Sequence, residues 1–164
     1  MIVSKALYTL GKEHNDKEID VLSIAWYQVS KRLQRLHTEQ GDEIAIRFLG
    51  KEQRLRQDDV LYEDENKRIV VDILPCEVII LKSDNVFEMV EAAYEIGNKH
   101  LPLYWEDGSL LLPFEKNTFE RLQSLGFIPI KGIASLRKPF EANVNPDHHK
   151  TTHSKTTKLK LLIK

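Results

Sequence analysis

The chain has 164 residues, of which 41% are hydrophobic and 30% are charged, and its formal net charge is -1. These values fit a soluble globular protein of one domain or two small ones. The near-neutral charge argues against nucleic-acid binding, which usually needs a strongly basic surface. No apolar run reaches the length of about 18 residues that a membrane-spanning helix needs, and the N-terminus lacks the apolar core of a signal peptide. We therefore expect a cytoplasmic protein with no membrane or nucleic-acid partner, and the single cysteine, Cys76, fits such a reducing compartment.

Residues 1–74 have the pattern of a small β-rich domain. A turn at residues 40–42 precedes an alternating run in which Ile44, Ile46 and Phe48 share one face of a strand. The order of apolar and polar residues therefore predicts a small, open β-sheet domain.

Two further features complete the prediction for this domain. A second pair of strands, at residues 59–62 and 69–74, flanks a polar turn. Residues 24–37 are ambiguous, because their composition suits a helix while their end alternates like a strand. Pro75 follows directly and suits a boundary between two domains.

Residues 75–140 predict a second, α+β domain. The expected order is a strand at 76–82, a helix, a hairpin about a turn at 106–108, a second helix and a strand at 127–135. This β-α-β-β-α-β order is that of a ferredoxin-like fold, in which two helices cover one face of a four-stranded sheet.

The expected ends of the two helices depend on capping residues. Ser83 or Asp84 can cap the start of the first helix, which we expect to run to Ile96, and Gly97 supplies the left-handed residue that ends it. The second helix is expected to end at Gly126. Its core-facing residues are predicted to be Phe119, Leu122 and Leu125.

The first helix is more apolar than packing on one sheet requires. Its polar residues Glu88, Glu91 and Glu95 form one narrow stripe, and the remaining surface is largely apolar. An apolar surface of this extent usually needs another partner. The β-rich domain can supply it, and so can a second copy of the chain through a two-fold contact.

His100 follows the first helix and has two possible roles. A histidine after a helix C-terminus can bond the last free carbonyls and interact favourably with the helix dipole. Alternatively, if the helix packs about a two-fold axis, His100 can meet its counterpart in the partner chain and begin a metal site.

Residues 141–164 form a basic tail with three of the six histidines, His148, His149 and His153. Its composition suggests a mobile segment that either remains solvated or reaches back to complete a metal shell. Imidazole ligands without a nearby thiolate suit Ni(II), Zn(II) or Cu(II). The candidate ligands are therefore His100 and the three tail histidines.

Several segments together resemble the urease accessory protein UreE family. They are YEIGNKH at residues 94–100, LPLYW, PFEKNTFERLQSLGF, GDEIAIRFLG and LRQDDVLYED. The segment Gly97-Asn98-Lys99-His100 is the most specific of them. Asp58 stands where the family usually has a glycine.

The resemblance implies a function as well as a fold. Members of the family are nickel metallochaperones with a peptide-binding-like N-terminal domain and a ferredoxin-like domain through which they form homodimers. The histidine that matches His100 binds nickel from both chains, and a C-terminal histidine joins it. The metal is passed through the GTPase UreG toward apo-urease. His153 is our first choice for the tail ligand, ahead of His149 and His148.

Other readings of the same fold have less support. An acylphosphatase-like enzyme needs a phosphate-binding loop after the first strand, and the loop LKSDNVF has neither glycine nor arginine. We therefore expect no enzymatic activity. The alternative to a nickel carrier is a dimeric peptide-binding adaptor without a metal role.

Overall fold

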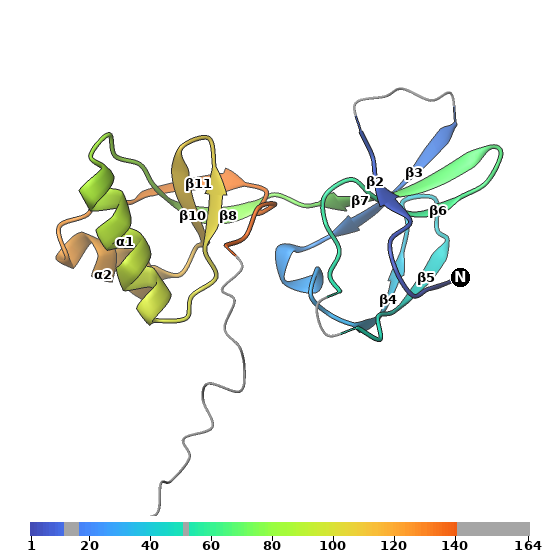
Figure 1. The fold of residues 1–164 in the computed structure, drawn as a ribbon, viewed down its shortest axis with the longest axis horizontal. Helices are drawn as coiled ribbons and strands as arrows, with labels where there is room; N and C mark the ends of the chain where they lie inside the picture. The colour runs from blue at the N-terminus through green and yellow to red at the C-terminus, as the bar shows by residue number, and fades with distance from the viewer. Residues whose placement is uncertain (12–16, 51–52, 141–164) are drawn as a thin grey trace, which may run out of the picture.

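The computed structural model describes residues 1–11, 17–50 and 53–140. It has an α+β fold with an N-terminal β-domain and a C-terminal domain of β-α-β-β-α-β order (Figure 1). This arrangement confirms the predicted fold class. None of the helices in the described part of the chain is long and apolar enough to cross a membrane.

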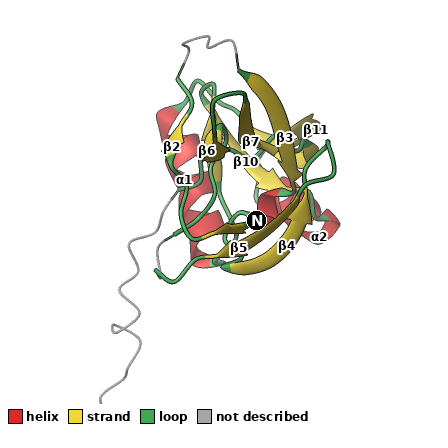
Figure 2. Ribbon diagram, turned by 90° about the vertical axis from the view of Figure 1, so that its right-hand side faces the viewer, coloured by secondary structure: helices red, strands yellow, loops and turns green. Residues whose placement is uncertain are grey.

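The N-terminal domain contains two sheets that share one core (Figure 2). One sheet has the order β1-β5-β4, and the other has the order β2-β6-β7-β3. The strands are β1 (Ile2–Val3), β2 (Tyr8–Thr9), β3 (Glu18–Ile24), β4 (Leu33–His37), β5 (Glu43–Arg47), β6 (Asp59–Glu63) and β7 (Lys67–Ile73).

The predicted alternation in this domain is confirmed. Ile44, Ile46 and Phe48 are all buried in the core that the two sheets enclose. The ambiguous segment divides into a short 3₁₀ helix, Trp26–Gln28, and strand β4. Asp58 has a φ of 64°, so the position at which the family usually has glycine is one that requires left-handed backbone.

The C-terminal domain is built on an antiparallel sheet of order β11-β8-β10-β9. Its elements are β8 (Cys76–Leu81), α1 (Val86–Asn98), β9 (Tyr104–Glu106), β10 (Ser109–Pro113), α2 (Lys116–Ser124) and β11 (Ile130–Ala134). Both helices cover one face of the sheet (Figure 1). The helices pack there on buried strand residues that include Ile79, Leu110 and Leu112.

The helix termini differ in part from the sequence prediction. The α1 N-cap is Asn85, whose side-chain oxygen accepts a hydrogen bond from the Phe87 N–H at 3.0 Å, so neither Ser83 nor Asp84 has this role. In α2, Leu122 is buried as predicted, whereas Leu125 is 44% exposed because it lies after the last helical turn.

The other face of the C-terminal sheet packs against the N-terminal domain. Val78, Tyr104, Leu111 and Leu136 form a small apolar cluster there, and Trp26 of the N-terminal domain packs on it. The rings of Trp26 and Tyr104 meet edge to face, with centroids 6.5 Å apart. The sheet is therefore covered by helices on one face and in part by a second domain on the other.

A polar network joins three strands of the N-terminal domain. The Glu63 carboxylate accepts hydrogen bonds from the Tyr8 hydroxyl at 2.6 Å, from Arg68 at 2.7 Å and from Lys17 at 3.0 Å. These hydrogen bonds lower the pKa of Glu63 from 4.5 to about 2, with the Tyr8 bond as the largest cause. The charged carboxylate is therefore favoured in the folded protein.

We predict that this network makes stability depend on pH. Because the folded pKa of Glu63 lies below its unfolded value, the contribution of Glu63 is complete above about pH 4.5 and is lost as the pH falls toward 2. The replacement Glu63→Gln should lower the free energy of unfolding at pH 7. The difference in this free energy between the variant and the wild type should shrink as the pH falls from about 4.5 toward 2. Urea denaturation at several pH values measures this.

The matched control for this prediction is Glu65→Gln in the adjacent turn. Glu65 is exposed and its side chain forms no hydrogen bond with the described residues. The control should follow wild type at every pH. An equal pH dependence in wild type and Glu63→Gln would contradict the assignment.

Candidate metal centre

The end of α1 determines where His100 lies. Helix α1 runs to Asn98, and the chain then closes with two hydrogen bonds, from the His100 N–H to the Gly97 carbonyl at 2.9 Å and from the Leu101 N–H to the Ile96 carbonyl at 3.4 Å. This bond pair defines a Schellman motif. Ile96 and Leu101 also pack in the same apolar cluster, as this motif commonly requires.

The prediction that Gly97 ends the helix is therefore wrong by three residues. Gly97 lies within α1, and His100 is the residue with left-handed backbone, at φ 54°. The contact between Ile96 and Leu101 determines which residue ends the helix, so the position of the glycine does not. Histidine is among the non-glycine residues that adopt this conformation more often than most.

His100 is exposed and stands at the end of an apolar stripe on α1. The stripe consists of Val86, Phe87, Val90 and Tyr94, which are 62–86% exposed. Their spacing places them on one side of the helix, away from Ala92 and Ile96 in the core. The stripe thus leads along the helix toward the histidine.

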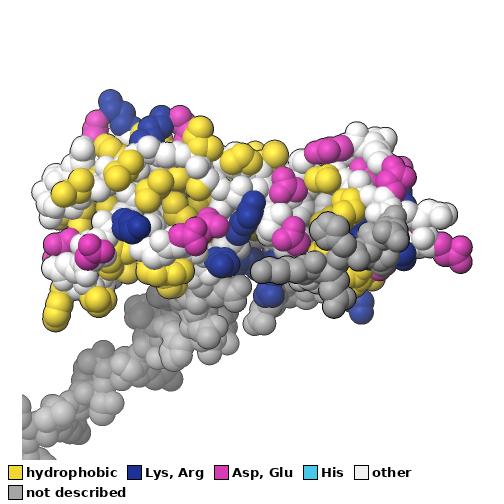
Figure 3. All heavy atoms as spheres, turned by 90° about the horizontal axis from the view of Figure 1, so that it is seen from above, with side chains coloured by type: hydrophobic (Ala, Val, Ile, Leu, Met, Phe, Trp, Pro, Cys, Tyr) yellow, Lys and Arg dark blue, Asp and Glu magenta, His cyan; other side chains and the backbone are white. Residues whose placement is uncertain are grey.

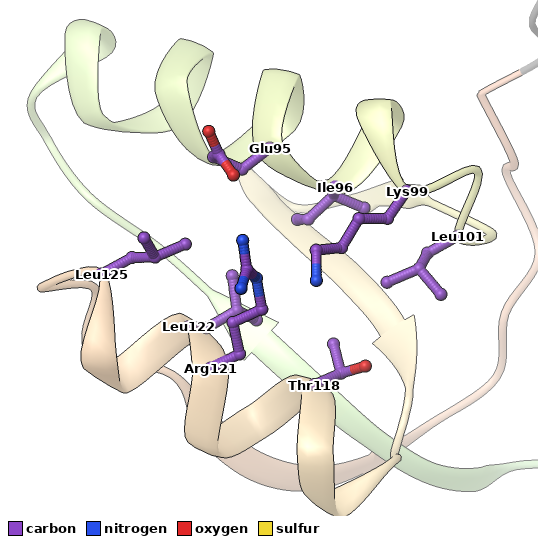
Figure 4. Close-up of a pocket in the computed structure, with 8 residues that line it drawn as sticks. All are labelled: Glu95, Ile96, Lys99, Leu101, Thr118, Arg121, Leu122 and Leu125. Atoms are coloured by element: carbon purple, nitrogen blue, oxygen red, sulfur yellow. The ribbon is translucent and has the colours of Figure 1, made fainter.

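The groove between α1 and α2 cannot hold a ligand. It is lined by Glu95, Ile96 and Lys99 from one side and by Thr118, Arg121 and Leu122 from the other (Figure 4). Its volume of about 10 Å³ is close to that of a single water probe. The groove therefore has no room for a ligand larger than about one water molecule.

His100 has no complete metal shell around it within the described chain. No group of three or more His, Cys, Asp or Glu side chains suited to a metal ion occurs within residues 1–11, 17–50 and 53–140. His148, His149 and His153 lie outside the described residues. His37 is exposed on β4 in the other domain.

Cys76 does not supply a thiolate to this site. It lies at the start of β8 and packs against the cluster on the sheet face opposite the helices. Burial raises the pKa of its thiol, so the neutral form is favoured. Cys76 therefore packs as a small, partly buried apolar residue.

Comparison with known proteins places the chain among urease accessory proteins. Residues 4–74 match the family model for the UreE urease accessory protein N-terminal domain, and residues 76–159 match the model for its C-terminal domain. The chain is 40% identical over 139 residues to the urease accessory protein UreE of Flavobacterium johnsoniae, covering 85% of this chain and 84% of the relative.

Two other relatives show similar coverage. The UreE protein of Actinobacillus pleuropneumoniae is 40% identical over 138 residues, 84% of this chain and 73% of the relative. That of Acetivibrio thermocellus is 34% identical over 154 residues, 93% of this chain and 100% of the relative. With both halves of the chain matched and this level of identity, the chain belongs to the UreE family of urease accessory proteins.

Proposed function

We propose that this protein is a nickel metallochaperone that carries Ni(II) for maturation of the urease active site. The family assignment supports a role in urease maturation. The structural observation that supports the metal role is the position of His100. It is exposed, has left-handed backbone and lies at the end of an exposed apolar stripe. The protein carries metal and catalyses no reaction.

The apolar stripe on α1 is the proposed homodimer contact. Val86, Phe87, Val90 and Tyr94 are largely exposed in the single chain, and hydrophobic side chains cover much of the C-terminal domain in Figure 3. A two-fold contact through α1 would bury the stripe of both chains at once. The same symmetry would place one His100 of each chain near the axis, where two imidazoles can share an ion.

The chemistry of a carrier requires ligands that can be exchanged. Neutral imidazole binds borderline divalent metals, so the same site would accept Zn(II) or Cu(II) as well as Ni(II). The proposed fixed pair of His100 rings sets the position of the ion, and His153, His149 or His148 completes its shell. Replacement of a tail ligand by a ligand of the recipient would release the metal.

The proposal includes the partners and the domain roles. In the cytoplasm, the recipients are the GTPase UreG and the apo-urease complex. We assign dimerisation and metal binding to residues 75–140, a peptide-binding-like role to residues 1–74 and ligand donation to the tail at 141–164. The two family matches, to residues 4–74 and 76–159, support the boundary between the first two of these segments.

We predict about one tightly bound nickel ion per dimer and a weaker affinity for it when His100 is replaced. His100→Gly removes the imidazole and tolerates the left-handed backbone, so the helix end should remain intact. Isothermal titration calorimetry should show a loss in affinity of at least about tenfold. Affinity of the wild type should also fall as the pH is lowered, because protonated imidazole cannot bind a metal.

Two control variants locate the effect. His37→Gln removes an exposed imidazole from the N-terminal domain and should leave nickel binding unchanged. Joint replacement of His148, His149 and His153 by alanine should weaken binding without abolishing it. Wild-type affinity in His100→Gly would refute the proposed site and favour an adaptor without a metal role.

We also predict that the dimer depends on the α1 stripe. Phe87→Glu introduces a charge at a side chain that is 86% exposed in the single chain, so the variant should fold and yet fail to dimerise. Leu49→Glu, at an equally exposed residue of the N-terminal domain, is the matched control. Light scattering should report a monomer for Phe87→Glu and a dimer for Leu49→Glu, and a dimeric Phe87→Glu would exclude this contact.

A further inference from the structure

A cleft of about 540 Å³ lies where the two domains meet. Its N-terminal side is formed by residues 54–58, which precede β6, together with Thr9 at the end of β2. Its C-terminal side is formed by the segment that follows β11, together with Glu106 at the end of β9. The helices α1 and α2 cover the other face of the sheet, so this cleft is separate from the site at His100.

Positive charge dominates the lining of this cleft. Four cationic residues, Arg54, Arg56, Arg137 and Lys138, face two acidic residues, Asp58 and Glu106. Within the described residues, the side chains of Arg56, Arg137 and Lys138 form no ion pair or hydrogen bond. In Figure 3, Lys and Arg side chains lie at the junction between the two domains, with Asp and Glu side chains beside them. The cleft is therefore cationic in a chain whose net charge is -1.

The cations near the β5–β6 loop are held on an ordered backbone. The Leu55 N–H donates to the Val29 carbonyl at 2.9 Å, and the Arg56 N–H donates to the Asp59 carboxylate at 2.8 Å. These bonds fix the backbone on both sides of the Arg56 side chain. Only the side chain would have to be ordered when a partner binds.

The opposite side of the cleft is equally fixed. The Trp105 N–H donates to the Lys138 carbonyl at 3.0 Å, and the Phe140 N–H donates to the Leu103 carbonyl at 2.8 Å. The segment after β11 thus pairs with β9 and holds its cations in place. Leu55 and Leu136, both 1% exposed, and Ile73, 2% exposed, provide apolar contacts at the base.

We propose that this cleft binds an acidic, extended segment of a partner protein. The cations stand on both sides of the cleft, so they match carboxylates distributed along a peptide. The volume far exceeds that of one inorganic anion, and the apolar base can accept the carbon chains of glutamate side chains. The tail of this chain is a poor occupant, because residues 141–164 carry five basic and two acidic residues.

The test uses the full chain with EDTA and a fluorescein-labelled peptide rich in aspartate and glutamate. Fluorescence anisotropy should show binding that weakens as salt is added, because salt screens exposed charges. The variant Arg56→Glu/Arg137→Glu/Lys138→Glu should lose at least about tenfold in affinity. The milder Arg56→Gln/Arg137→Gln/Lys138→Gln variant should show a smaller loss in affinity. It keeps the test valid if the charge-reversal variant does not fold.

The matched control is Arg32→Glu/Arg47→Glu/Lys82→Glu, which makes the same change in net charge at exposed cations outside the cleft. It should bind the peptide within about twofold of wild type. An equal loss in the control, or wild-type affinity in both cleft variants, would overturn the proposal. So would displacement of the peptide by inorganic phosphate or by a single-stranded oligonucleotide at the same concentration of charge.

The same experiment distinguishes this proposal from the metal role. His100→Gly lies outside the cleft and should bind the acidic peptide as wild type does. The cleft variants should in turn keep wild-type nickel binding in calorimetry. Loss of peptide binding in His100→Gly would contradict an independent site in the cleft.

Discussion

The packing of α1 against the sheet is the interaction on which the rest of the C-terminal domain depends. Ala92 and Ile96 bury one side of the helix among the apolar residues of β8 and β10. Ile96 also meets Leu101 across the helix end, and this contact sets the residue at which the helix ends. The opposite side, with Phe87 and Tyr94, must then face outward. One packing contact therefore sets both the exposed stripe and the position of His100.

The second face of the sheet explains why the two domains form a cleft. An antiparallel sheet with apolar residues on both faces needs cover on both. The helices supply one cover, and Trp26 of the N-terminal domain contributes to the other by packing on Tyr104. Beside this contact, the two domains leave a cleft. The cationic residues line this cleft.

The sequence predicted the order of elements in the C-terminal domain well because each had a local signal, whereas the N-terminal strands β1, β2 and β3 were not predicted. The hairpin is an example, since Asp107 and Gly108 both adopt the left-handed backbone that its turn requires. The end of α1 was predicted less well. Gly97 is a strong local signal for a helix end, but the tertiary contact between Ile96 and Leu101 determines where the helix ends. His100 was identified as a candidate ligand, but its left-handed conformation was not foreseen. The cationic cleft was not predicted either, because it depends on how the two domains pack together and the local sequence pattern does not show this.

A ligand placed just after a helix differs from one placed within it. At this position the His100 side chain extends beyond the last helical turn, while two backbone hydrogen bonds and the Ile96–Leu101 contact hold its backbone. The proposed ligand thus has an ordered backbone and an exposed side chain. Within the described chain, His100 belongs to no group of three or more His, Cys, Asp or Glu side chains that could hold a metal ion. Under the proposed function, the metal shell must therefore be assembled from two chains and their tails. Metal affinity then depends on dimerisation. Dissociation of the dimer, or release of a tail from the ion, would lower the affinity for the metal.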